Sequence, residues 1–236
     1  MMVRDLVTGE EVPRLIMDET GWGRALPRGT VTILTGVPGS GKSTFLLKSL
    51  GTMEGTILYI GSEESSHVIS DRCVRVSGRE DMYVYHCTSI FETLAWANKL
   101  DPDILVLDSL NGCTGVESHG ENANLSDKLK SLSEFCLAHG TTAIVISHIN
   151  KDNQVFGPRT LEHMSDINMV IEKIEGGELD EVRVIRATKN RFGPTGRYAA
   201  FRHAESGLVW TSDDEESLTA QREKKAKRVD KMSEVE

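Results

Sequence analysis

The sequence predicts an α/β fold in which a mostly parallel central sheet is followed by antiparallel strands near the C-terminus. Short apolar runs alternate with helical patterns over the first two thirds of the chain, an order typical of a parallel sheet with helices on its faces. A glycine-rich loop joins the first run to a helix, and β-branched segments around a glycine turn follow residue 166. These later segments indicate a hairpin that extends the same sheet.

Five short runs of apolar residues predict the parallel strands. Each run is almost unbroken by polar residues, as expected for a strand that is covered on both faces. The runs are residues 30–36, 56–61, 82–86, 103–108 and 142–148. We therefore expect a sheet whose two faces are both buried.

The connecting segments include two with clear helical features. The apolar residues that recur at helical spacing in one of them are Leu125, Leu129, Leu132 and Cys136. The other, residues 89–100, begins with Ser89, which can cap a helix, and has Glu92 as the capping-box partner. Farther on, the segments 166–174 and 181–189 predict a hairpin around the turn EGGELD, and two further short strands are predicted at 197–201 and 207–210.

Composition narrows the class of protein. The chain has 236 residues, of which 39% are hydrophobic, and its net charge is −9. The negative net charge argues against a surface coated in cations, but a local basic groove could still bind phosphates. No apolar run approaches the roughly 20 residues that span a bilayer, and the N-terminus is too polar for a signal peptide, so we expect a cytoplasmic protein without a membrane partner. The four scattered cysteines, Cys73, Cys87, Cys113 and Cys136, form no CxxC pair and are expected to be buried, reduced thiols.

The strongest motif is GVPGSGKST at residues 36–44, which fits the P-loop (Walker A) pattern G-x-x-x-x-G-K-[ST] between a predicted strand and a predicted helix. Such a loop points backbone N–H groups at phosphate oxygens, and the helix that follows adds the positive end of its dipole. The predicted nucleotide-binding residues are Gly36, Val37, Pro38, Gly39, Ser40, Gly41, Lys42, Ser43 and Thr44. The motif predicts binding of ATP with Mg²⁺, with Lys42 on the β- and γ-phosphates and the Ser43 hydroxyl on the metal.

Acidic residues follow two of the predicted strands. Asp108 ends the run ILVLD, where its carboxylate can hold the Mg²⁺ shell through water. Glu63 and Glu64 follow the run TILYIG, where a carboxylate can orient and deprotonate the attacking water. One or both of them could instead begin the next helix, where the dipole favours acids; we expect one of each, with Glu63, nearer the strand end, as the catalytic base.

Two further polar clusters are less specific. His148 ends a strand beside Ser147 and Asn150 and is a candidate sensor of the γ-phosphate, although a capped strand end with ordinary surface residues fits the spacing nearly as well. Lys189 and Arg191 follow the strand EVRVI, and their spacing alone fits a solvated strand end. The last segment, 211–236, has few apolar residues and dense mixed charge, so we expect a flexible or helical tail.

Together these segments resemble bacterial RadA (Sms), an ATPase of the RecA superfamily. The segments GVPGSGKSTFLLKSL, LYIGSEES, ILVLDS, SHINKDNQVFGPRTLEHMSD and ATKNRFG occur in that family's order, and KNRFG, residues 189–193, is its hallmark. The resemblance covers roughly residues 13–210 and implies a RecA-like ATPase domain there, after an N-terminal extension at 1–12.

The family also carries an N-terminal four-cysteine zinc module and a C-terminal Lon-protease-like domain. This sequence has no cysteine before Cys73 and a charged segment after about residue 211, so the resemblance is to the ATPase core.

The resemblance also implies roles for particular residues. Lys42, Ser43, Asp108 and Glu63 keep the roles given above in an ATPase that forms a ring on DNA, expected to be a hexamer. Lys189 and Arg191 would project toward the triphosphate of the neighbouring subunit and act as catalytic cations. The family's channel-facing loop matches residues 155–163, which makes the DNA-binding candidates Lys151, Arg159 and His163.

The function expected from this resemblance is an ATP-dependent motor on single-stranded or branched DNA, with DNA-stimulated ATP hydrolysis, in recombination, repair or replication. Two alternatives remain open at this point. One is a KaiC-like oligomeric switch or scaffold that acts on protein partners, which the acidic net charge favours slightly. The other is a loader that uses ATP only to assemble.

Overall fold

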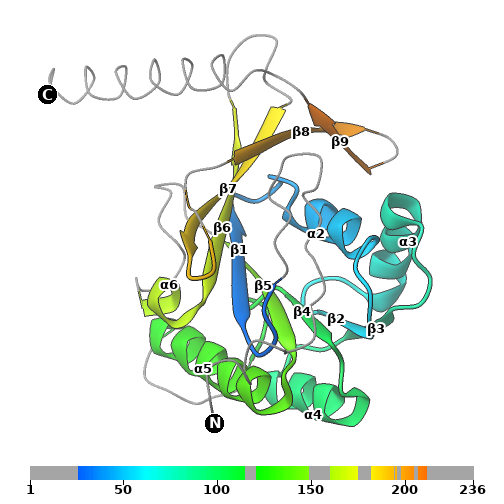
Figure 1. Ribbon diagram of the computed structural model, residues 1–236. Helices are drawn as coiled ribbons and strands as arrows, with labels where there is room; N and C mark the ends of the chain where they lie inside the picture. The colour runs from blue at the N-terminus through cyan, green and yellow to red at the C-terminus, as the bar shows by residue number, and fades with distance from the viewer. Residues whose placement is uncertain are drawn as a thin grey trace, which may run out of the picture.

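The computed structural model describes residues 26–114, 121–148, 160–174, 182–193, 195, 198–204 and 207–211. In these residues the chain forms one nine-stranded sheet in the order β3-β2-β4-β5-β1-β6-β7-β8-β9, flanked by helices (Figure 1). The expected N-terminal extension and all of the expected tail except Thr211, the last residue of β9, lie outside the described residues.

The elements follow the predicted order. The strands are β1 Val31–Gly36, β2 Ile57–Gly61, β3 Tyr83–His86, β4 Ile104–Asp108, β5 Thr142–His148, β6 Ile167–Lys173, β7 Val182–Asn190, β8 Tyr198–Ala204 and β9 Gly207–Thr211. The helices are α2 Lys42–Leu50, α3 Ser66–Ser77, α4 Ile90–Leu100, α5 Glu121–His139 and α6 Thr160–Met164. Every predicted strand and both helices singled out from the sequence are confirmed.

The sheet changes from parallel to antiparallel at β6. Strands β3, β2, β4, β5, β1 and β6 pair in parallel, whereas β6–β7, β7–β8 and β8–β9 are antiparallel. The predicted hairpin is therefore confirmed as β6 and β7, and its first strand also pairs with β1. The parallel register sets Gly36 opposite His148 and Gly61 opposite Asp108, so the carboxyl ends of β1, β2, β4 and β5 share one edge, which we call the carboxyl edge.

Both faces of the sheet are covered, as the unbroken apolar runs predict. One apolar cluster joins the sheet to α2 and α3, and a second joins it to α4 and α5 (Figure 1). Neighbouring residues of β1 divide between them: Ile33 lies in the second cluster and Leu34 in the first. Leu125, Leu129, Leu132 and Cys136 of α5 are all buried in the second cluster, which confirms the predicted apolar stripe of that helix.

The predicted cap of α4 is half confirmed. The Ser89 side chain accepts a hydrogen bond from the Glu92 backbone N–H at 3.4 Å. In a capping box the Glu92 carboxylate would also accept a hydrogen bond from the Ser89 N–H. Here the Ser89 N–H donates to the Cys87 sulfur instead, and the Glu92 carboxylate accepts from the Cys87 thiol. All four cysteines are free and buried, as predicted.

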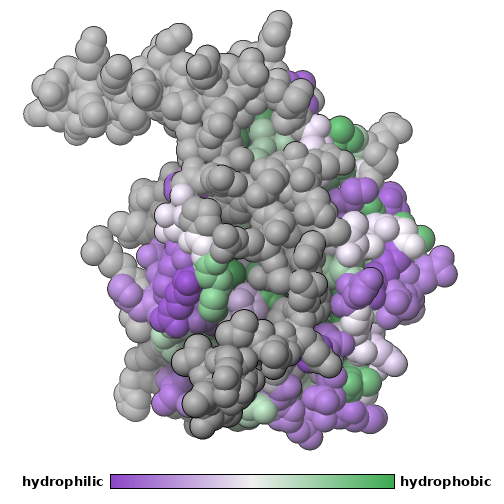
Figure 2. All heavy atoms as spheres, viewed as in Figure 1, coloured by the Kyte–Doolittle hydropathy of each residue, from purple (hydrophilic) through white to green (hydrophobic). Residues whose placement is uncertain are grey.

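The described part of one face of the molecule is mainly polar. On the face shown in Figure 2, hydrophilic side chains cover most of the described surface and apolar side chains are scattered between them. Among the described residues, no helix combines the length and the apolar character that crossing a membrane requires.

Candidate functional site

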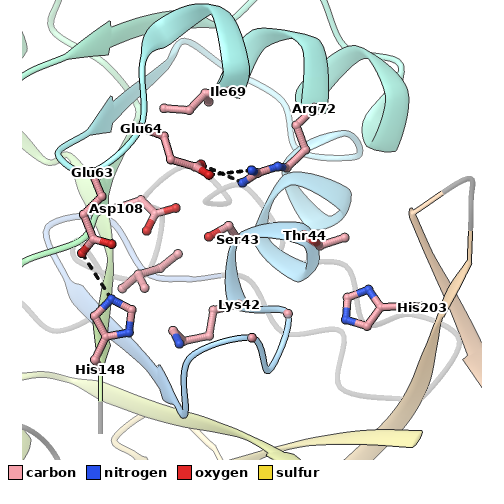
Figure 3. A pocket seen from close by; sticks show the side chains of 13 residues that line it. Lys42, Ser43, Thr44, Glu63, Glu64, Ile69, Arg72, Asp108, His148 and His203 are labelled. Carbon is pink, nitrogen blue, oxygen red and sulfur yellow. Dashed lines mark hydrogen bonds and ion pairs between the residues drawn. The ribbon is translucent and has the colours of Figure 1, made fainter. Parts of the chain in front are cut away.

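A cavity of about 420 Å³ opens at the carboxyl edge of the sheet, above the start of α2 (Figure 3). Eight of the predicted site residues line it: Gly39, Gly41, Lys42, Ser43, Thr44, Glu63, Asp108 and His148. They come from four different parts of the chain, and the parallel register brings them together. This volume is within the range of small-molecule and cofactor sites.

The loop that follows β1 has the geometry of a phosphate cradle. Gly41 is the N-cap of α2, with φ 94° and ψ 19°, a left-handed conformation that only glycine adopts without strain. The first intrahelical bond runs from the Phe45 N–H to the Gly41 carbonyl at 2.8 Å. Helix geometry leaves the earlier N–H groups without intrahelical acceptors, and Lys42, Ser43 and Thr44 line the cavity. This end of α2 is therefore suited to bind an anion.

The Lys42 side chain folds back over the same loop. Its ammonium donates hydrogen bonds to the carbonyls of Gly36 at 2.8 Å and Val37 at 3.1 Å. Burial lowers the pKa of Lys42, and the negative charges of Asp108 and Glu63 only partly offset that effect. The predicted binding residues Gly36 and Val37 thus contribute carbonyls that position Lys42.

Asp108 ends β4 as predicted and faces the start of α2. Its carboxylate accepts a hydrogen bond from the Tyr59 hydroxyl at 2.6 Å. Burial raises the pKa of Asp108, and hydrogen bonds from Tyr59 and Ser43 act in the opposite direction. The contact with Ser43 brings together the two residues that the sequence assigns to Mg²⁺.

Glu63 and Glu64 have different partners. Glu63 accepts hydrogen bonds from the Ser109 hydroxyl at 2.5 Å and from the His148 ring, whose Nε2 lies 3.2 Å away. Burial raises the pKa of Glu63, but the bond from Ser109 and the nearby His148 and Lys42 outweigh it, and the net shift is downward. Glu63 is therefore ionised at neutral pH.

Glu64 is held by an arginine. Both of its carboxylate oxygens accept hydrogen bonds from Arg72 of α3, at 2.7 and 2.8 Å (Figure 3). Neither acid belongs to the next helix, since α3 begins at Ser66 with Ser65 as its N-cap. The expectation that one of the two begins that helix is wrong, because the chain turns before the helix starts.

His148 lies where β5 reaches the cavity. Its backbone N–H donates to the Asn111 side chain at 3.1 Å, and Ser147 donates to the same oxygen at 3.1 Å. The ring contact with Glu63 links the candidate sensor at the end of β5 to the candidate base after β2, across the one strand, β4, that lies between them. The sequence places both at the same edge but does not predict that they touch.

Lys189 and Arg191 lie at the opposite edge of the sheet, which we call the amino edge. Asn190 pairs with Ile167, which in turn pairs with Thr32 near the start of β1. Gly36 lies at the other end of β1, and a strand rises about 3.3 Å per residue, so the two cations are on the order of 15 Å from the loop of their own chain. Neither lines the cavity.

Both cations have partners at the amino edge. The Lys189 ammonium donates to the carbonyls of Glu162, His163 and Ser165 at the end of α6. Arg191 pairs with the Asp166 carboxylate at 2.8 Å, and the Arg191 side chain is 55% exposed. Burial, followed by the charge of Arg191, lowers the pKa of Lys189. Lys189 therefore also fastens α6 to β7.

Of the DNA-binding candidates, only His163 is described. It is exposed at the end of α6, and its carbonyl accepts from Lys189. Lys151 and Arg159 lie outside the described residues.

Among the residues of the site that were not predicted, four are polar or charged side chains that line the cavity or hold its acids. Tyr59 and Ser109 hold the acids, Arg72 holds Glu64, and His203 of β8 lines the cavity. Tyr59 is fully buried, and a tyrosine within an otherwise aliphatic strand is a signal of a hydroxyl that needs a partner. No local pattern points to the other three.

The donor set fits a nucleoside triphosphate with Mg²⁺. The start of α2 and Lys42 suit phosphates, and the Ser43 hydroxyl beside the Asp108 carboxylate supplies the oxygen ligands that Mg²⁺ prefers. Within the described residues no group of three or more His, Cys, Asp or Glu side chains could hold a metal by itself.

The fold and the site define an ATPase domain of RecA-like architecture. The chain belongs to the AAA domain family, which matches residues 5–154. It is 32% identical over 86% of its length to the DNA repair protein RadA of Chlamydia pneumoniae, of which it covers 47%. The chain thus spans about half the length of the curated relatives it matches.

Solved structures show the same fold. The chain is similar to a DnaB-like replicative helicase, with a TM-score of 0.69, 13% identity, and coverage of 78% of this chain and 58% of that one. It is also similar to a KaiC-like protein from Pyrococcus horikoshii, with a TM-score of 0.66, 18% identity, and coverage of 85% and 96%.

Proposed function

We propose that the chain is an ATP-dependent DNA-binding motor of RadA type, which acts in recombination, repair or replication by branch migration or by translocation on single-stranded DNA. The similarity to proteins named DNA repair protein RadA supports the DNA assignment. The fold shared with a replicative helicase is consistent with movement on a strand.

The residues around the cavity suit hydrolysis by in-line attack of water on the γ-phosphate. Bound Mg²⁺ would neutralise charge on the phosphate oxygens. Glu63, ionised and held by Ser109 and His148, orients the water and accepts its proton. Lys42 and the N–H groups at the start of α2 stabilise the charge on the transferring group.

The observation that carries the proposal is the separation of the two edges. Arg191 lies too far from the P-loop of its own chain to reach a phosphate there, and it belongs to the KNRFG segment that the resemblance assigns to a neighbour's triphosphate. In its ion pair with Asp166 the Arg191 side chain is 55% exposed, whereas Asp166 is only 17% exposed and also accepts a hydrogen bond from the Val31 N–H, so Asp166 keeps a partner when Arg191 leaves it. A phosphate of a neighbouring subunit can therefore replace Asp166 as the partner of Arg191. This arrangement requires an oligomer, and we propose a hexameric ring.

The segment after β5 offers a route from nucleotide to DNA. His148 contacts Glu63 and is followed directly by the segment that carries Lys151 and Arg159. We propose that Lys151, Arg159 and the exposed His163 contact the phosphate backbone. Binding through such contacts releases counterions and weakens steeply as salt rises.

The test is the ATPase rate of the purified chain with and without single-stranded DNA. We expect stimulation by DNA that is lost at high salt, and loss of that stimulation in Lys151→Ala/Arg159→Ala with the DNA-independent rate retained. The motor assignment fails if DNA changes neither the ATPase rate nor the sedimentation of the protein. That result would favour the nucleotide-dependent switch instead.

A further inference from the structure

The C-terminal hairpin brings a histidine to the nucleotide site of its own chain. His203 of β8 lines the cavity together with Gly41 and Thr44. A Cβ atom placed on Gly41 would lie 2.5 Å from the His203 Nε2, so the imidazole sits directly against the N-cap of α2. His203 is far from Gly41 in sequence, and no motif in the sequence points to it.

An aromatic cluster fixes the position of this histidine. Phe201 and His203 are two residues apart in β8 and share a face of the strand, with ring centroids 6.1 Å apart. Phe201 stacks on Phe45 of α2 at 6.0 Å, and Trp210 of β9 meets both rings edge-on at 6.0 to 6.2 Å. The hairpin β8–β9 is thereby fastened to the helix that begins at the phosphate cradle.

His203 lies at the end of the cavity opposite Glu63 and His148. Figure 3 shows Glu63 and His148 at one end of the cavity, Lys42 and Ser43 between, and Thr44 and His203 at the other. Glu63 must face the γ-phosphate to activate water, and Lys42 and Ser43 serve the β- and γ-phosphates. The chain of phosphates therefore runs toward Thr44, and the ribose and base lie beyond it.

The chemistry of the imidazole suits a base better than a phosphate. Burial, followed by the charge of Arg183, lowers the pKa of His203 below its usual value, which disfavours the charged form of the ring. His203 as a whole residue keeps exposed surface, and a flat aromatic ring is a platform on which nucleobases stack.

We propose that His203 stacks on the base of the nucleoside triphosphate held by the P-loop of the same chain. This inference rests on nucleotide binding at that loop and is independent of DNA. It makes the β8–β9 hairpin part of the nucleotide site, so that a single chain supplies both the phosphate cradle and the base platform.

Calorimetric titration with ATP and with inorganic tripolyphosphate, both in Mg²⁺, tests the proposal on the full chain. Stacking of one base on one aromatic side chain is worth a factor of about ten or more in affinity. We expect His203→Ala to weaken ATP about tenfold and to leave tripolyphosphate unchanged, and His203→Phe to bind ATP within about threefold of the wild type. His67→Ala, an exposed histidine of α3 that does not line the cavity, is the matched control and should match the wild type.

Two results would overturn the proposal: an unchanged affinity of His203→Ala for ATP, or an equal loss for ATP and tripolyphosphate, which would place the ring on a phosphate. If His203→Ala does not fold, 8-azido-ATP photolabelling of the wild type decides the matter. Label on a peptide containing His203 supports the proposal, and label only on other peptides contradicts it. A wild type that binds neither ligand would instead overturn the nucleotide site itself.

Discussion

The two edges of the central sheet carry their cations in opposite settings. At the carboxyl edge, Lys42 is 5% exposed and lies among carbonyls and carboxylates of its own chain. At the amino edge, Arg191 is 55% exposed and pairs with a single carboxylate. The first setting is preorganised for chemistry within one chain. The second is stable by itself but leaves an arginine free to exchange its partner.

This difference shows why a single chain reveals only part of the proposed function. The acids, the lysine and the helix terminus are brought together by the parallel register, so their contacts exist in the monomer. Arg191 has no role in that cavity unless a second chain supplies one. Single substitutions at the two edges can establish whether the amino edge takes part in the chemistry.

The largest expected effect is that of Arg191→Ala. A cation of this kind that stabilises the transferring phosphoryl group contributes about a thousandfold or more to kcat, so turnover should fall by about that factor. The free energy of unfolding should change by about 1 kcal/mol, because the Arg191 side chain is 55% exposed and Asp166, although only 17% exposed, keeps its hydrogen bond from the Val31 N–H. Steady-state ATPase assays and chemical denaturation measure the two effects.

Arg28→Ala is the matched control for this change. Arg28 lies just before β1 at the amino edge and pairs with Asp103 at 2.7 Å, with 43% of its side chain exposed. It should alter stability as little as Arg191→Ala does, and it should leave kcat unchanged. Equal kcat values for the two variants would make Arg191 an ordinary surface cation.

The second-largest expected effect is on kcat, and it distinguishes the roles of Glu63 and Glu64 at the carboxyl edge. Glu63→Gln should lower kcat about a hundredfold, because the carboxamide cannot accept the proton of the water, and should change the Kd for ATP less than about threefold. Glu64→Gln, which loosens the bond to Arg72, should lower kcat less than about tenfold. A larger loss of kcat in Glu64→Gln than in Glu63→Gln would reverse the assignment of the base.

The smallest expected effect is a change in stability on substitution of Lys128, which is buried like Lys42 but lies outside the cavity. Lys128 is 5% exposed on α5, and its ammonium donates a hydrogen bond to the Cys113 carbonyl. Burial lowers the pKa of Lys128, so the unfolded chain holds this proton more tightly than the folded one. As pH rises through the folded-state pKa, the folded chain sheds the proton and the cost of the buried charge is relieved.

Lys128→Met should therefore differ from the wild type by no more than about 1 kcal/mol at pH 7, where relief of the buried charge is offset by loss of the hydrogen bond. The wild type should gain stability relative to the variant between pH 7 and pH 10. Denaturation curves at the two pH values measure this, and a difference independent of pH would contradict it.

Much of the fold was predictable because its signals are local. Apolar runs, the glycine pattern of residues 36–44 and the acid at the end of β4 each lie within a few neighbouring residues, and all are found where predicted. In a parallel sheet the carboxyl ends of the strands lie at the same edge. This rule places four residues together: Gly36, Glu63, Asp108 and His148.

The contacts within the site were not predictable from such signals. Ser109, just after β4, reaches Glu63, just after the neighbouring strand β2, and His203 reaches Gly41 only because an aromatic cluster fastens the last hairpin to α2. These contacts depend on tertiary packing between segments distant in sequence. The pairing of Glu64, and not Glu63, with Arg72 of α3 likewise depends on such packing.

The most direct test of the account is to mix Lys42→Ala subunits with Arg191→Ala subunits, after confirming by native mass spectrometry that mixed oligomers form. Each variant should be inactive alone, since one lacks a working P-loop and the other lacks the cation that serves a neighbour. Mixed oligomers should recover ATPase activity wherever an intact P-loop meets an intact Arg191 of the next subunit. Mixed oligomers that form and remain inactive would contradict the claim that the two edges of the sheet meet between subunits.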